Sequence, residues 1–168
     1  IEDALVERLR KAQTHQKGWA ALSLGIFAAG LVDRGDQLTQ NTLETMHQSF
    51  RRGRNSSNKA ACALALALSQ YQPAAEDIRK SLKKVKDPGY RGLVAVFLGL
   101  MEDKKSIPLL LTQLEESLAK PMLLSRTALA LALMNGQEAT DMLIGMLEKG
   151  SGKKPTVATM EASSKALA

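Results

Sequence analysis

Residues 87–114 have the pattern of two helices joined by a tight turn, and this pattern limits the folds open to the chain. Pro88 opens the unit, and proline suits the first turn of a helix because it has no N–H to leave unpaired. Apolar residues then follow at steps of three and four, which is the periodicity of a helix. A polar break at residues 102–105 precedes Ser106 and Pro108, which are typical helix-starting residues. The unit therefore predicts an αα-hairpin.

The same anatomy recurs along the chain at a nearly constant spacing. A basic residue lies eight positions before the small residue of the first helix in three units, as Lys17, Lys59 and Arg91. A period in the low thirties with two helices per unit indicates a helical repeat array. We therefore expect an all-α fold, a right-handed α-solenoid of about four stacked antiparallel helix pairs. The small residues are spaced by 42, 32, 33 and 34 positions and are Gly25, Ala67, Gly99, Ala132 and Ala166.

These small residues also predict how the helices pack. We expect Ala67, Gly99 and Ala132 to lie at helix crossings that have no room for a larger side chain. The spacing of 42 makes one unit longer than the others, and we place its excess at residues 31–41, as an extended helix end and a longer turn.

The repeats set the expected domain organisation, a single array over residues 1–168. Because both outer units are incomplete, we expect the sequence to be part of a longer protein. Apolar stripes would then be exposed at both ends, and the array could associate end to end. The stripes are Leu5, Val6 and Leu9 at one end and Met160 and Leu167 at the other. The expected parts are a second helix at 1–16, a long unit at 17–58, units at 59–87, 88–119 and 120–150, and the start of another unit at 151–168.

Residues 87–114 resemble the short HEAT-like repeats first recognised in phycobilisome lyases. The shared pattern is a proline-led basic start, A-x-x-L-G in the first helix, Asp103 in the turn, and a proline followed by leucines in the second helix. The other units match only at their small and apolar positions. The resemblance implies a HEAT-repeat fold in which the second helices line the concave surface. It also leaves open a chromophore-lyase-like accessory protein, which would help to place a chromophore on another protein.

Basic residues are concentrated between residues 51 and 91. That stretch holds ten Lys and Arg against three Asp and Glu, whereas the rest of the chain carries a net charge of −1. Because repeats stack side by side, we expect residues 51–54 and the helix end at 80–86 to share one edge. Such a patch attracts phosphates or an acidic protein surface. Lysines at helix ends also complement the helix dipole, so a purely structural reading of these charges stays open.

We interpret the chain as a non-catalytic scaffold for protein–protein interaction, with a protein partner whose surface is acidic. The alternative is an electrostatic nucleic-acid-binding module that uses residues 51–91. No aromatic residues alternate with these charges, as stacking on bases would require. The residues expected at the partner-binding surface are Arg51, Arg52, Arg54, Glu76, Arg79, Lys80, Lys83, Lys84, Gln113, Glu116, Glu138 and Asp141.

No catalytic, cofactor-binding or metal-binding set of residues can be assembled from the sequence. Glu44 and His47 have the spacing of a di-iron ligand pair, but such a site needs a second pair and two further carboxylates. Cys62 is the only cysteine, which excludes an internal disulfide and is compatible with the cytoplasm. It lies in an apolar helical stretch, so we expect a buried, unreactive thiol. No apolar run reaches the ~18 residues needed to span a bilayer.

Overall fold

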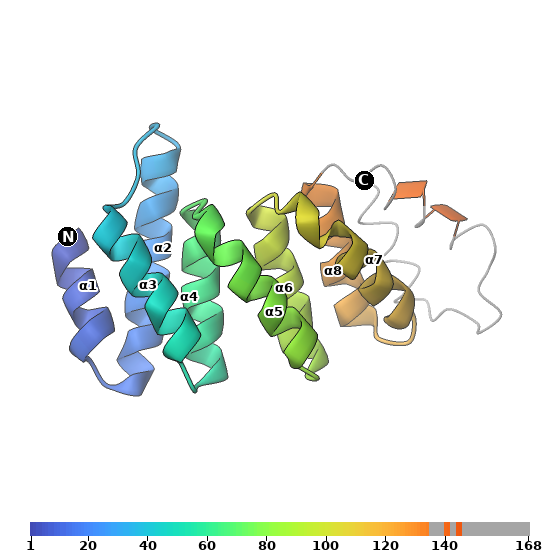
Figure 1. The fold of residues 1–168 in the computed structure, drawn as a ribbon, viewed down its shortest axis with the longest axis horizontal. Coiled ribbons are helices and arrows are strands. Elements are labelled where there is room, and N and C mark those ends of the chain that lie inside the picture. The colour runs from blue at the N-terminus through green and yellow to red at the C-terminus, as the bar shows by residue number, and fades with distance from the viewer. Residues whose placement is uncertain (135–139, 142–143, 146–168) are drawn as a thin grey trace. The chain divides into compact units, whose positions relative to one another are not determined.

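The computed structural model describes residues 1–134, 140–141 and 144–145. Over these residues every regular element is a helix (Figure 1), which confirms the predicted all-α class. None of the described helices is both long and apolar enough to cross a membrane. The chain divides into two compact units, residues 1–80 and residues 81–168, and we describe each unit by itself. The single continuous array stays a prediction.

Unit 1 consists of helices in two layers. The helix α2 packs on α4 in one layer and α1 packs on α3 in the other, while α1 also contacts α2 and α3 also contacts α4 (Figure 1). Leu24, Met46, Phe50 and Leu66 are almost completely buried between these helices. The elements are α1 (Glu2–Lys11), α2 (Thr14–Val32), α3 (Gln40–Arg52), α4 (Ser56–Leu68), the 3₁₀ turn η1 (Gln72–Ala74) and the start of α5 (Ala75–Lys84).

Two helices of unit 1 begin earlier than the sequence predicted. The break after α1 falls at Ala12 and Gln13, so α2 starts at Thr14 and not after residue 16. The helix α4 starts at Ser56, before the expected start of its unit at residue 59, because the Asn55 side chain accepts a hydrogen bond from the Asn58 backbone N–H at 3.0 Å. An asparagine at this position satisfies one of the unpaired N–H groups at a helix start.

The extra length of the first full unit lies where it was expected. The helix α2 has 19 residues, whereas α4 has 13. A turn follows it, in which Gly35 adopts a φ of +78°, a left-handed conformation that glycine adopts without strain. The chain then runs without helix to Thr39, and Leu38 is buried on the way. An extended helix end and a longer turn thus account for the long unit.

Unit 2 repeats the layered packing. The helix α6 packs on α8, and α7 also packs on α8. Asp87 accepts a hydrogen bond from the Tyr90 backbone N–H at 2.7 Å and so caps α6, in which Pro88 occupies the first turn. Ser106 precedes α7 as expected, but its hydroxyl donates to the Asp103 carbonyl oxygen at 2.7 Å and does not cap the helix. The elements are the end of α5, α6 (Pro88–Leu100), the 3₁₀ turn η2 (Lys104–Ser106), α7 (Ile107–Glu116) and α8 (Pro121–Leu133).

Two glycines allow neighbouring first helices to approach closely. A Cβ on Gly25 would lie 2.8 Å from the Ala65 Cα, and a Cβ on Gly99 would lie 2.8 Å from the Ala130 Cα and carbonyl oxygen. The prediction that Gly99 lies at a helix crossing is therefore confirmed.

The alanines that meet these glycines lie two residues before the predicted ones. Ala67 is fully buried, as expected, but Ala132 is exposed, so its prediction was wrong. Two residues along a helix correspond to more than half a turn, which takes the side chain to the opposite face.

The first helix does not expose the apolar stripe that we expected. Val6 and Leu9 are 5% and 1% exposed, because α1 packs on both α2 and α3. Leu5 is half-buried. The expectation of an exposed N-terminal stripe was therefore wrong for Val6 and Leu9. The stripe expected at Met160 and Leu167 lies outside the described residues.

Candidate protein-binding groove

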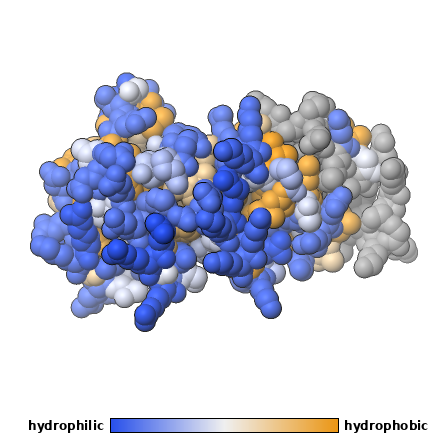
Figure 2. All heavy atoms as spheres, viewed as in Figure 1, coloured by the Kyte–Doolittle hydropathy of each residue, from blue (hydrophilic) through white to orange (hydrophobic). Residues whose placement is uncertain are grey.

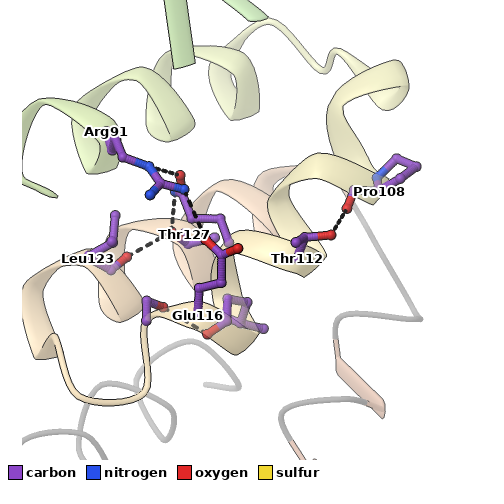
Figure 3. Close-up of polar contacts among 9 residues, drawn as sticks. Arg91, Pro108, Thr112, Glu116, Leu123 and Thr127 are labelled. Carbon is purple, nitrogen blue, oxygen red and sulfur yellow. Dashed lines mark hydrogen bonds and ion pairs between the residues drawn. The ribbon is translucent and has the colours of Figure 1, made fainter. Parts of the chain in front are cut away.

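A chain of hydrogen bonds joins the three helices α6, α7 and α8 of unit 2 (Figure 3). Arg91 Nε donates to Gln113 Oε1 at 3.0 Å, and Gln113 Nε2 donates to Thr127 Oγ1 at 2.8 Å. The Thr127 hydroxyl in turn donates to the Leu123 carbonyl oxygen at 2.8 Å. Gln113 and Thr127 are 1% and 0% exposed, so these bonds are shielded from water. The network holds the Arg91 guanidinium in a fixed position.

Arg91 itself is only partly buried, with 23% of its side chain exposed. Its Nη2 lies 3.5 Å from Glu116 Oε2, and the Glu116 side chain is 59% exposed. Charge-assisted hydrogen bonds of this type are usually about 2.7–2.9 Å long, so this contact is a weak one. A guanidinium has five N–H donors in a fixed fork. Within the described part of the chain, Gln113 and Glu116 therefore leave part of the Arg91 fork available.

Arg91 lies in an open groove of about 490 Å³ in unit 2. One helix face of α7 contributes to its lining, because residues three and four apart fall on the same side of a helix. The end of α5 and the residues after it contribute the rest. Among the described residues of this lining, three side chains are cationic and one is a carboxylate. The lining residues are Leu109, Thr112, Gln113 and Glu116 from α7, Leu82, Lys83, Val85 and Lys86 from the α5 end, and Arg91 from α6.

Unit 1 contains a smaller hollow of about 370 Å³. Two of its cations are engaged within the unit: Arg10 Nη2 donates to Asn41 Oδ1 at 3.0 Å and to Thr45 Oγ1 at 2.7 Å, and Lys17 Nζ donates to the Arg10 carbonyl oxygen at 3.2 Å. This hollow therefore has less free positive charge for a ligand than its composition suggests.

Cys62 lies at the wall of this hollow and is 3% exposed, as predicted. Burial raises the pKa of its thiol to about 12, and the charge of Lys17 offsets only part of that effect. The thiol therefore keeps its proton at neutral pH. Since the thiolate is the reactive form of cysteine, the protonated thiol is a poor nucleophile.

Three of the six predicted partner-binding residues of unit 1, namely Arg51, Glu76 and Lys80, form ion pairs within the unit. Arg51 Nε lies 3.4 Å from Asp77 Oδ2, and Lys80 Nζ lies 2.6 Å from Glu76 Oε1. Arg79 is half-buried, whereas Arg54 is exposed. Arg52 is exposed and lines the smaller hollow. Residues 51–91 therefore carry less unpaired positive charge than their number of Lys and Arg residues implies.

Unit 2 brings three of the predicted residues together in the groove, namely Lys83, Gln113 and Glu116. The expectation that Gln113 is exposed was wrong, because its amide is satisfied by Arg91 and Thr127 within the helix packing. Lys84 and Asp141 are exposed and do not line the groove. Glu138 lies outside the described residues.

Arg91, Lys86 and Thr112 also line the groove, although they were not among the predicted partner-binding residues. The signal for Arg91 was present, because it is one of the recurring basic residues of the first helices. The two other recurring basic residues, Lys17 and Lys59, also contact neighbouring second helices. Lys17 Nζ reaches the Arg10 carbonyl oxygen at 3.2 Å, and Lys59 Nζ lies 5.0 Å from the centre of the Phe50 ring. This repeated position therefore marks a contact between helix layers.

His47 is not on a solvated helix face, since only 16% of its side chain is exposed. Its Nε2 lies 2.9 Å from Asp77 Oδ2, and its ring packs edge-on against Tyr71. Glu44, its partner in the ligand-like spacing, accepts a hydrogen bond from Gln40 Nε2. Among the described residues no group of three or more His, Cys, Asp and Glu side chains is arranged to hold a metal ion.

The groove residues come from α6, from α7 and from the end of α5 with the residues after it. Hydrogen bonds tie α6 to α7 and α7 to α8. No protein-family model and no curated protein matches this sequence.

Proposed function

We propose that this chain is a non-catalytic protein-interaction scaffold built from HEAT-like repeats. The observation that carries this proposal is the groove of unit 2, in which Lys83, Lys86 and Arg91 lie beside one face of α7. In an array of helix pairs, the layer of second helices forms a long, accessible surface that suits a protein ligand.

The repeat architecture is supported by a crossing that occurs once in each unit. Gly25 meets Ala65 in unit 1, and Gly99 meets Ala130 in unit 2. In both cases a Cβ added to the glycine would lie 2.8 Å from the alanine Cα. Both crossings join consecutive first helices. Equivalent residues making equivalent contacts are what stacked repeats require.

The surface chemistry supports a protein ligand over a small molecule. The groove is open, and its lining mixes charged groups with the half-buried aliphatic side chains Val85 and Leu109. Small-molecule sites are concave and bury most of the ligand. Figure 2 shows hydrophilic side chains over most of the α1 and α3 side of unit 1, and both hydrophilic and hydrophobic side chains on unit 2. Mixed surfaces of this kind are typical of transient protein interfaces.

The nucleic-acid alternative has less support from the contacts of its basic residues. Arg51 and Lys80 have acidic partners, and Lys59 lies over the Phe50 ring. Each such contact takes up a charge that a phosphate would otherwise neutralise.

Site-specific photo-crosslinking in cells tests the scaffold proposal. We expect a photoreactive residue at Thr112, which is exposed in the groove, to capture a discrete protein, and the captured protein to bind the purified full chain. The same probe at Lys104, which is exposed but outside the groove, is the control. Capture of nucleic acid alone, or equal capture from both positions, would contradict the proposal.

A further inference from the structure

We propose that the unit 2 groove binds an extended acidic segment of a partner protein, and that one carboxylate of this segment replaces Glu116 on Arg91. This inference rests on the proposed scaffold function and names the partner class for its groove. Charge complementarity carries it, since the described lining of the groove holds three cations, Lys83, Lys86 and Arg91, and one carboxylate.

Arg91 is prepared for a carboxylate by its hydrogen bond to Gln113. Because Nε donates to Gln113 at 3.0 Å, and Gln113 is held in turn by Thr127 at 2.8 Å, the guanidinium plane is oriented before a ligand arrives. An oriented guanidinium loses little side-chain entropy when it pairs bidentately with a carboxylate. With 23% of its side chain exposed, Arg91 is also partly shielded from water, which strengthens such a pair.

Glu116 occupies the place of the ligand only loosely. Its Oε2 lies 3.5 Å from Arg91 Nη2, and 59% of its side chain is exposed, so water competes for both groups. A ligand carboxylate that engages both Nη groups makes two short charge-assisted hydrogen bonds in its stead. Glu116 therefore acts as an internal competitor, and it lowers the affinity of the groove for acidic ligands.

Lys83 and Lys86 supply the second point of attachment. Both are exposed, and among the described residues neither has an ion-pair partner. The half-buried Val85 and Leu109 share the lining with them. A segment with acidic side chains around an aliphatic one therefore fits this groove.

The lining disfavours nucleic acid. None of the described residues that line the groove is aromatic, so this lining offers a base no ring on which to stack.

The test measures binding of the full chain to a fluorescent peptide of alternating glutamate and leucine, by fluorescence anisotropy. A peptide with glutamine in place of glutamate is the ligand control. We expect Arg91→Lys, which keeps the charge and loses the fork, to weaken binding about tenfold. We expect Lys83→Gln with Lys86→Gln to weaken it by a similar factor, whereas Lys104→Gln with Lys105→Gln, an equal change of charge outside the groove, leaves it within about twofold.

The decisive comparison uses two neighbouring carboxylates. Glu116→Gln removes the internal competitor and should raise the affinity for the acidic peptide about threefold or more. Glu115→Gln makes the same change of charge at an exposed residue that does not line the groove, and should change affinity less than twofold. Equal gains from both variants, or no loss in Arg91→Lys while its circular dichroism melt is unchanged, would overturn the inference.

Arg91→Lys also removes a hydrogen-bond partner from the buried Gln113 and can therefore destabilise the fold. The circular dichroism melt of this variant is the control for that effect. The lysine variants and Glu116→Gln change only exposed side chains, and they decide the question if Arg91→Lys is unstable. Tighter binding of a duplex DNA probe than of the peptide, or concentration-dependent self-association in place of peptide binding, would also overturn it. If a partner captured through Thr112 binds all of these variants equally, the inference fails while the scaffold proposal stands.

Discussion

Replacing Gly99 by alanine should separate α6 from α8 and destabilise the chain. The added Cβ would lie 2.8 Å from both the Cα and the carbonyl oxygen of Ala130, and neither backbone atom can move by a rotamer change. Non-bonded carbon atoms prefer separations of about 3.5–4.0 Å, so the helices must part by roughly 0.7 Å or more at this point. Overpacking of this kind costs about 1–3 kcal/mol.

A helix-propensity term opposes part of this cost. Alanine is favoured over glycine by about 0.8–1.0 kcal/mol in a helix interior, and by less here because Gly99 is the last residue but one of α6. We therefore expect a net loss of about 1–2 kcal/mol in the free energy of unfolding. Urea denaturation followed by far-UV circular dichroism measures it.

Two further variants make this prediction specific. Gly30→Ala in α2 adds a Cβ with nothing within 4 Å, so it should stabilise the chain by about 0.4–1 kcal/mol. Adding Ala130→Gly to Gly99→Ala should not restore stability, because the colliding atoms belong to the Ala130 backbone and remain in glycine. If Gly99→Ala stabilises the chain as Gly30→Ala does, the close crossing of α6 and α8 does not exist.

Four other predictions concern the buried network, the thiol, the tryptophan and the basic stretch. Thr127→Val removes the hydroxyl that accepts from the buried Gln113, so urea denaturation should show a loss of about 1–3 kcal/mol. Burial raises the pKa of Cys62 to about 12, so its contribution to stability is intact below the ordinary value of 9.0 and is lost as pH rises from there. The free energy of unfolding of Cys62→Ala should therefore change less with pH above pH 9 than that of the unmodified chain. Equal slopes for the two proteins would refute this. Trp19 is the only tryptophan and is 71% exposed, so its fluorescence should be quenched by acrylamide nearly as fully in the folded as in the urea-unfolded chain, and protection would refute it. As a scaffold, the chain should bind duplex DNA weakly even at low salt. The nucleic-acid alternative would be favoured by tight binding that falls ~10³-fold between 50 and 200 mM salt and is lost when four basic residues are replaced by Glu. These four residues are Arg51, Arg52, Lys83 and Lys84.

The repeat period located most of the helices but could not orient every side chain on them. Pro88 and Pro121 mark helix starts in the sequence and begin α6 and α8 in the structure. The period also aligned Gly99 with Ala132, yet the residue that meets Gly99 is Ala130. A period identifies equivalent residues in successive units, whereas a crossing joins opposite faces of two helices. Those faces are set by tertiary packing.

The groove was harder to predict because its key contacts are long-range. Gln113 belongs to a polar position of α7 by local pattern, but its partner Thr127 lies in another helix. Only the folded unit shows that a buried amide is satisfied there. Trp19 is the opposite case, because a large hydrophobic residue on a helix suggests burial, whereas Trp19 is 71% exposed.

The direct backbone contacts at Gly25 and Gly99 also define where a repeat can grow. Gly25 is the twelfth residue of α2 and Gly99 is the twelfth residue of α6, although α2 has 19 residues and α6 has 13. All of the additional length of α2 therefore lies beyond the point of contact, where it leaves the close approach of Gly25 to Ala65 unaltered. The distal ends of the first helices can thus accept insertions, while the segment between each helix start and its glycine keeps a fixed length.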